Sequence, residues 1–191
     1  MKNFDPDKLA RYETENWVAY YQKDWPKLLR VSVAMVKEGF GLSWPQAIYG
    51  AYLVGRAEIK AAPFPNNDIP AAIAYMTHFM HMIKRIYHTA FDPAEAARAE
   101  VNWWVVHRRI SNQRDNQALI DALADSYTVM YQLPCSQVQD AAWHRAEAMQ
   151  YSDRWVAGGK LSGSPLIEQM QAELQRSYRA LQTAVKPMAK T

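Results

Sequence analysis

Five ionisable side chains occupy positions where the surrounding helix face is otherwise apolar, and they are of types that move protons or bind ligands. They are three glutamates, one histidine and one arginine from four predicted helices: Glu13, Glu58, Glu100, His107 and Arg145. Each position was placed by advancing about 100° per residue around its predicted helix. An ionised side chain is costly to bury alone, so we expect each of them to be paired, protonated or facing a cavity.

The segment 93–109 shows the pattern most clearly. Glu100 and His107 lie two turns apart, near the middle of an arc that also holds Trp103 and Trp104. In the segment 44–61, Glu58 lies on the same side as Ala47, Ala51 and Gly55, whose small size predicts a close helix contact. The other two candidates share their apolar arcs with larger neighbours, Glu13 with Trp17 and Arg145 with Met149.

Two interpretations of these charges are open. In the first they form a structural network, in which Glu13, Glu58 or Glu100 pairs with Arg145 and fixes the register of the helices. In the second they line a polar interior pocket of a few hundred Å³. There Glu13, Glu100 and His107 are candidate catalytic residues. Glu58, Arg145, Trp17, Trp103 and Trp104 are then candidate ligand-binding residues.

A metal site is a further alternative, formed by Glu13, Glu100 and His107. Di-iron helical bundles place a Glu and a His three residues apart on each of two helices. Here Trp103 follows Glu100 at that spacing and Ala61 follows Glu58, so a ferritin-like site is disfavoured. Other histidines, His78, His81 and His88, share a polar helix side with Lys84 and Arg85, which predicts a solvated face.

Composition limits the class of protein. The 191 residues are 49% hydrophobic, with seven glycines, one cysteine and a net charge of +3. Few glycines favour helices, one cysteine excludes an internal disulfide, and the small charge gives nucleic-acid binding little support. With no apolar run of membrane-spanning length and no signal peptide at the N-terminus, we expect a soluble cytoplasmic protein without a membrane partner. The signatures of ferritin-like, haem-oxygenase-like, globin and helix-turn-helix proteins are absent, and the sequence identifies no cofactor.

Prolines and capping residues divide the chain into eight predicted helices, which gives an all-α fold: a single globular bundle. The predicted helices span residues 5–23, 26–39, 44–61, 69–89, 93–109, 116–133, 136–156 and 165–186. Residues 1–157 form the predicted bundle core. Residues 158–191 form a flexible Gly/Ser linker and a C-terminal docking helix of the same domain.

The C-terminal helix carries a narrow apolar seam: Ile167, Met170, Leu174, Tyr178, Leu181 and Val185. Such a seam docks on one surface only, and we expect that surface to be the chain's own domain. The alternative function is a non-catalytic interaction protein that forms a homodimer or binds a partner through this helix, or through the basic connection 107–114. The best functional expectation is a helical protein that binds a small ligand, or carries out acid–base chemistry, in a polar interior pocket.

Overall fold

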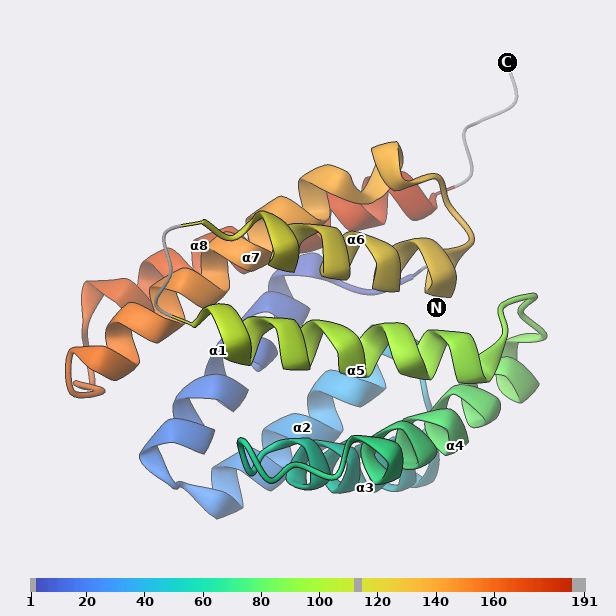
Figure 1. Ribbon diagram of the computed structural model, residues 1–191, viewed down its shortest axis with the longest axis horizontal. Coiled ribbons are helices and arrows are strands. Elements are labelled where there is room, and N and C mark those ends of the chain that lie inside the picture. The colour runs from blue at the N-terminus through green and yellow to red at the C-terminus, as the bar shows by residue number, and fades with distance from the viewer. Residues whose placement is uncertain (1–2, 112–114, 187–191) are drawn as a thin grey trace.

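The computed structural model describes residues 3–111 and 115–186, and in these ranges it is all-α (Figure 1). Residues 112–114 of the basic connection therefore lie outside the described residues. The helices are α1 (Pro6–Gln22), α2 (Trp25–Phe40), α3 (Trp44–Ala61), α4 (Ile69–Tyr87), α5 (Pro93–Ile110), α6 (Gln117–Tyr131), α7 (Cys135–Ala157) and α8 (Pro165–Val185). The predicted all-helical bundle is confirmed, with helix ends within two residues of those expected.

Local sequence explains where the helices begin and end. Asp5, Asp24 and Asp68 each accept a hydrogen bond from a backbone N–H of the turn that follows. In α1–α5 and α8 a proline occupies one of the first two helical positions, where its missing N–H costs no helical hydrogen bond. At the other end, Lys23 and Gly41 take left-handed conformations, with φ of 61° and 60°, that stop α1 and α2.

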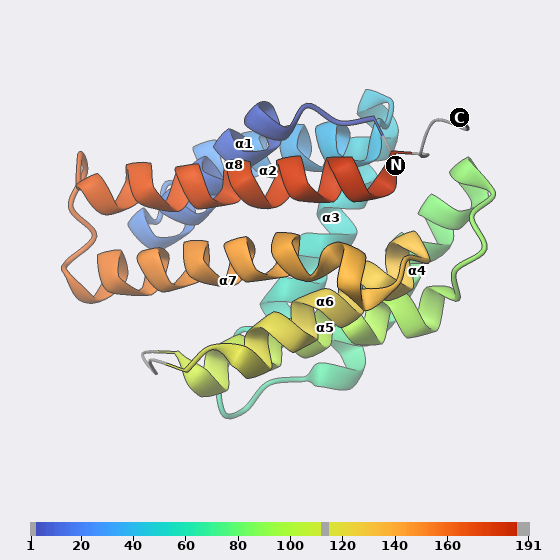
Figure 2. The ribbon, with the colours of Figure 1, turned by 90° about the horizontal axis from the view of Figure 1, so that it is seen from above.

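The helices follow one another around the bundle in chain order. Each helix packs against the next, and α8 returns to pack against α1, so the order closes on itself. Figure 2 shows α7 and α8 running side by side, with α5 and α6 below them. This arrangement lets residues from α1, α3, α5 and α7 approach one another although they are far apart in the sequence.

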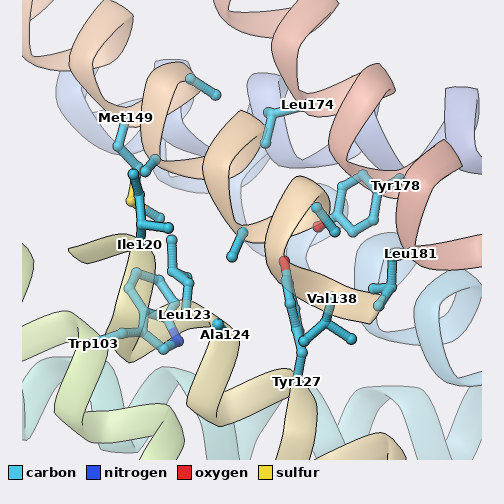
Figure 3. Close-up of a cluster of buried hydrophobic side chains, with 14 of the residues drawn as sticks. Trp103, Ile120, Leu123, Ala124, Tyr127, Val138, Met149, Leu174, Tyr178 and Leu181 are labelled. Atoms are coloured by element: carbon cyan, nitrogen blue, oxygen red, sulfur yellow. The ribbon is translucent and has the colours of Figure 1, made fainter. Parts of the chain in front are cut away.

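Two hydrophobic cores fill the bundle. One is formed mainly by α1, α6, α7 and α8, and Figure 3 shows part of it. The other is formed mainly by α2–α5. Trp104 of α5 and Tyr131 of α6 pack against both cores. The helices α5 and α6 therefore join the two cores.

Helix α3 makes one very close contact and leaves another predicted contact unmade. Ala47 is fully buried, and a Cβ on Gly50 would meet side chains of α2 and α4 at 3.0–3.2 Å. Apart from the neighbouring backbone of α3 itself, no heavy atom of the described residues lies within 4 Å of the position that a Cβ on Gly55 would take. The predicted close contact is therefore wrong at Gly55, which faces outward although Ala47, two turns earlier, is buried.

The C-terminal helix docks on its own chain. The seam residues Met170, Leu174, Leu181 and Val185 are each at most 2% exposed, and α8 packs against α7 and α1. Gln182 of α8 also donates a hydrogen bond to the carbonyl oxygen of Phe4, at 2.6 Å. The seam is thus covered by the chain itself. Within the described residues, no helix is long and apolar enough to cross a membrane.

Candidate functional site

A buried ionic contact joins Glu13 of α1 to Arg145 of α7. A guanidinium nitrogen of Arg145 donates to Oε1 of Glu13 at 2.6 Å. Glu13 is 2% exposed and the Arg145 side chain 13% exposed, so the pair is almost entirely removed from water. Of the three glutamates considered from the sequence, Glu13 is the one that pairs with Arg145, as the structural-network interpretation requires.

Aromatic side chains complete this pair. The hydroxyl of Tyr178 donates to Oε2 of Glu13, and Arg145 donates to the hydroxyl of Tyr127 at 3.3 Å. The guanidinium of Arg145 lies over the ring of Trp103, 4.9 Å from its centroid. Figure 3 shows the hydroxyls of Tyr127 and Tyr178 pointing toward the same region of the core. Together the five residues form what we call the Glu13–Arg145 network.

The electrostatics of this network keep Arg145 charged and the tyrosines neutral. Burial lowers the pKa of Arg145, but the Glu13 carboxylate, together with Tyr127, Tyr178 and Glu100, more than offsets this, so the pKa lies well above its ordinary value. Burial, followed by the nearby Glu13 carboxylate, raises the pKa of Tyr178 well above its usual range. The phenol of Tyr178 therefore remains a hydrogen-bond donor to Glu13 at neutral pH.

Two buried donors at this network have no hydrogen-bond partner among the described residues. They are Nε of Arg145 and the indole nitrogen Nε1 of Trp103. A buried donor without a partner is costly, and most such groups in proteins bind water or a ligand. The two nitrogens belong to side chains that stack on each other.

Glu100 of α5 does not join the Glu13–Arg145 network directly. Its Oε2 accepts a hydrogen bond of 2.7 Å from the hydroxyl of Ser126 on α6. Glu100 is half-buried, and its charge raises the pKa of Tyr131 on α6, where burial is the larger cause. The carboxylate of Glu100 therefore adds negative charge between α5 and α6 without an ion-pair partner among the described contacts.

Glu58 of α3 differs from the other two glutamates, because it reaches solvent. The residue is exposed, which corrects the expectation that it would be buried. Its carboxyl nevertheless has a pKa of about 7. Loss of hydration beside the surrounding protein is the largest cause, the charges of Glu100 and Glu13 add to it, and Arg108 opposes them.

His107 pairs with a residue that the sequence analysis did not single out. Its Nε2 lies 3.2 Å from Oδ2 of Asp153 on α7, and both side chains are mostly buried. Burial and the Asp153 charge raise the pKa of the neighbouring Tyr21. The adjacent Arg108 donates to the carbonyl oxygen of Ala62, which ties the end of α3 to α5.

A second buried ionic contact lies between α7 and α8. Nδ1 of His144 is 2.6 Å from Oε2 of Glu173, which is 8% exposed. The exposed Arg176 contacts the other oxygen of Glu173. Sequence analysis missed Glu173, because most of the neighbouring positions in α8 outside the seam are polar. This contact helps to fix α8 on α7.

The residues proposed for a metal site do not come together. Glu13 contacts Arg145 and Tyr178, Glu100 contacts Ser126, and His107 contacts Asp153. Within residues 3–111 and 115–186, no group of three His, Cys, Asp or Glu side chains is arranged to hold a metal ion. The described geometry thus gives the mononuclear alternative no ligand set.

The three candidate tryptophans have different environments. Trp103 is 9% exposed, while Trp17 and Trp104 are half-buried against the hydrophobic cores. A surface depression of about 680 Å³ lies elsewhere, between α4, α5 and α6, with Arg98, Asn102 and Asp125 in its lining. This depression contains none of the candidate tryptophans or glutamates. His78, His81 and His88 are exposed, as their polar helix side predicted.

Comparisons with protein-family models, with curated proteins and with solved structures give no match.

Proposed function

We propose that the protein binds a small organic molecule at the polar centre between α1, α3, α5 and α7, with Glu58 as the group that gains or loses a proton. The observation that carries the proposal is that Glu58 is exposed to solvent while the nearby carboxylates of Glu100 and Glu13 add to the raising of its pKa, of which burial is the largest cause. A carboxyl group with a pKa of about 7 is half protonated near neutral pH. General acid–base catalysis requires a proton carrier of that kind.

The Glu13–Arg145 network supports the proposal because it holds a negative charge in a fixed position. Because Arg145 and Tyr178 already bind both oxygens of Glu13, this glutamate is held in place and does not need to contact the ligand. It contributes its negative charge to the surroundings of Glu58. In this proposal Glu13 contributes a fixed negative charge, and Glu58, rather than Glu13, gains or loses the proton.

The charges indicate the chemistry of the ligand. Glu58 and Glu100 present acceptor oxygens, whereas Arg108, the cation that opposes the pKa shift of Glu58, also donates to a backbone carbonyl. A ligand with a basic nitrogen or a hydroxyl would pair with these oxygens and relieve their mutual repulsion. An acceptor atom on the same ligand, or a water molecule beside it, would satisfy the free donors of Trp103 and Arg145.

Thermal-shift measurements test this proposal. The probes are small amines and amino alcohols, compared with carboxylic acids of the same size, at pH 6 and pH 8. We expect amines to raise the melting temperature of the wild type and to lose this effect in Glu58→Gln and Glu100→Gln. The matched control Glu168→Gln alters an exposed glutamate in the first turn of α8 and keeps the wild-type response. Equal shifts in all variants, or shifts from the acids alone, would contradict the proposal.

The alternative function, an interaction protein that uses its C-terminal helix, has less support. The apolar seam of α8 that it would need is covered by α7 and α1.

A further inference from the structure

Helix α3 distributes its side chains in an unusual way. The side toward the protein interior carries small residues, among them Ala47, Gly50 and Ala57. The opposite side, which we call the outer face of α3, carries large apolar and aromatic residues: Trp44, Ile48, Tyr49, Tyr52 and Ile59. All five are 51–65% exposed. In a helix that packs only within its own chain, the large apolar residues would point inward.

We propose that the outer face of α3 binds the same face of a second copy of this chain, with the two helices crossing at Gly55. Aromatic side chains present about 150–250 Å² each when fully exposed, so the outer face offers on the order of 500 Å² of mostly apolar surface. With the side chains around its edge, this approaches the roughly 800 Å² per partner of a standard protein interface. The largest exposed apolar patch on a typical monomer is about 300–600 Å² and is often functional.

Gly55 is the second observation, and it favours a protein helix as the partner. It lies between Tyr52 and Ile59 near the centre of the outer face, with open space beside it. Glycine weakens a helix interior relative to alanine, and here neither a close neighbour nor a positive φ requires it. A small residue at this position lets another helix approach the backbone closely, whereas fluid lipid adapts equally well to a larger side chain.

The outer face is also suited to pairing with itself. In a two-fold pair the residues near the axis meet their own copies. With the axis at Gly55, the bulky Tyr52 and Ile59 of each copy flank the glycine of the other. Arg56, a cation beside this face, lies over the rings of Tyr52 and Tyr75 of its own chain, at 5.9 Å and 5.1 Å. Its charge is therefore drawn back from the partner, which reduces repulsion between the two copies.

Sedimentation equilibrium of the full-length chain tests the proposal over micromolar to near-millimolar concentrations. We expect the wild type to shift from 21.9 kDa to twice that mass. Gly55→Leu and Ile59→Arg should each weaken the dimer at least about tenfold. Leu161→Arg is the matched control, because Leu161 is 66% exposed and Ile59 is 65% exposed, and it should dimerise like the wild type. Circular dichroism checks that each variant is folded.

Three results would overturn the proposal. The first is a wild type that remains monomeric at every concentration. The second is a monomer that binds vesicles containing phosphatidylserine, which would assign the face to a lipid surface. The third is a dimer that survives both Gly55→Leu and Ile59→Arg, which would place the interface on another surface. If Ile59→Arg does not fold, Gly55→Leu still decides between these results, because the added side chain enters open space in the monomer.

Discussion

Replacement of Arg145 by methionine gives the most quantitative test of the Glu13–Arg145 network. The substitution keeps an apolar stem in the core but leaves Glu13, which is 2% exposed, without its cation. Removing one partner of a buried ion pair costs about 3–5 kcal/mol. Because Tyr178 still donates to Glu13, we expect a loss near the lower end, about 3 kcal/mol of the free energy of unfolding.

A double-mutant cycle separates the pair from other effects of the substitution. In Arg145→Met with Glu13→Gln, the glutamine carbonyl still accepts from Tyr178 and no charge is buried. The loss in the free energy of unfolding of the double variant should therefore be about 2 kcal/mol smaller than the sum of the losses of the two single variants. Urea denaturation followed by circular dichroism at pH 7 measures each free energy of unfolding.

A matched exposed pair provides the control. Arg179 of α8 contacts Asp7 of α1 at 2.8 Å, but both side chains are more than half exposed. Arg179→Met should cost at most about 1 kcal/mol. The reasoning is refuted if Arg145→Met costs no more than Arg179→Met, or if the losses in the double variant are additive.

Three further predictions follow from individual contacts. Glu58→Gln should change how the stability of the protein depends on pH. Because the folded-state pKa of about 7 lies above the ordinary value of 4.5, the wild type should lose stability relative to the variant as pH rises from 4.5 through 7. Thermal melts of both proteins at pH 5 and pH 8 measure this difference. Tyr178→Phe removes a hydrogen bond to a buried carboxylate and should cost about 1.5–3 kcal/mol in urea denaturation, so an unchanged midpoint would contradict that contact. Gly50→Ala should destabilise the chain by about 1–3 kcal/mol, because the added methyl group would crowd side chains of α2 and α4. Gly55→Ala should instead stabilise the monomer by up to about 1 kcal/mol, because alanine favours a helix and the added methyl group enters open space. Chemical denaturation of dilute samples measures both changes.

The sequence predicted the helices well because the determinants of their ends are local. Proline and aspartate act within one turn of the helix that they start, as Asp5-Pro6 and Asp92-Pro93 do here. The periodic pattern also predicted that Glu13 and Arg145 point inward. It could not predict that they contact each other, because that depends on how α1 and α7 are placed by the other helices.

The same reasoning was wrong for Glu58 and incomplete for His107. Glu58 shares a side of α3 with Ala51 and Gly55, and small residues suggested a buried contact where the structure leaves open space. Asp153 lies eight residues after Arg145, about 80° farther around α7, and the apolar pattern of the helix gave no reason to single it out. Its contact with His107 arises only from the packing of α5 and α7 through their neighbours.

Titration of Glu58 by carbon-13 NMR is the most direct test of the polar centre. The carboxyl resonance is assigned by its absence in Glu58→Gln and followed from pH 4 to pH 9. We predict a midpoint near pH 7, with a shift to lower pH in Glu100→Gln, which removes a neighbouring negative charge. A midpoint near the ordinary value of 4.5, unchanged in Glu100→Gln, would contradict a proton-active Glu58 and with it the proposed function.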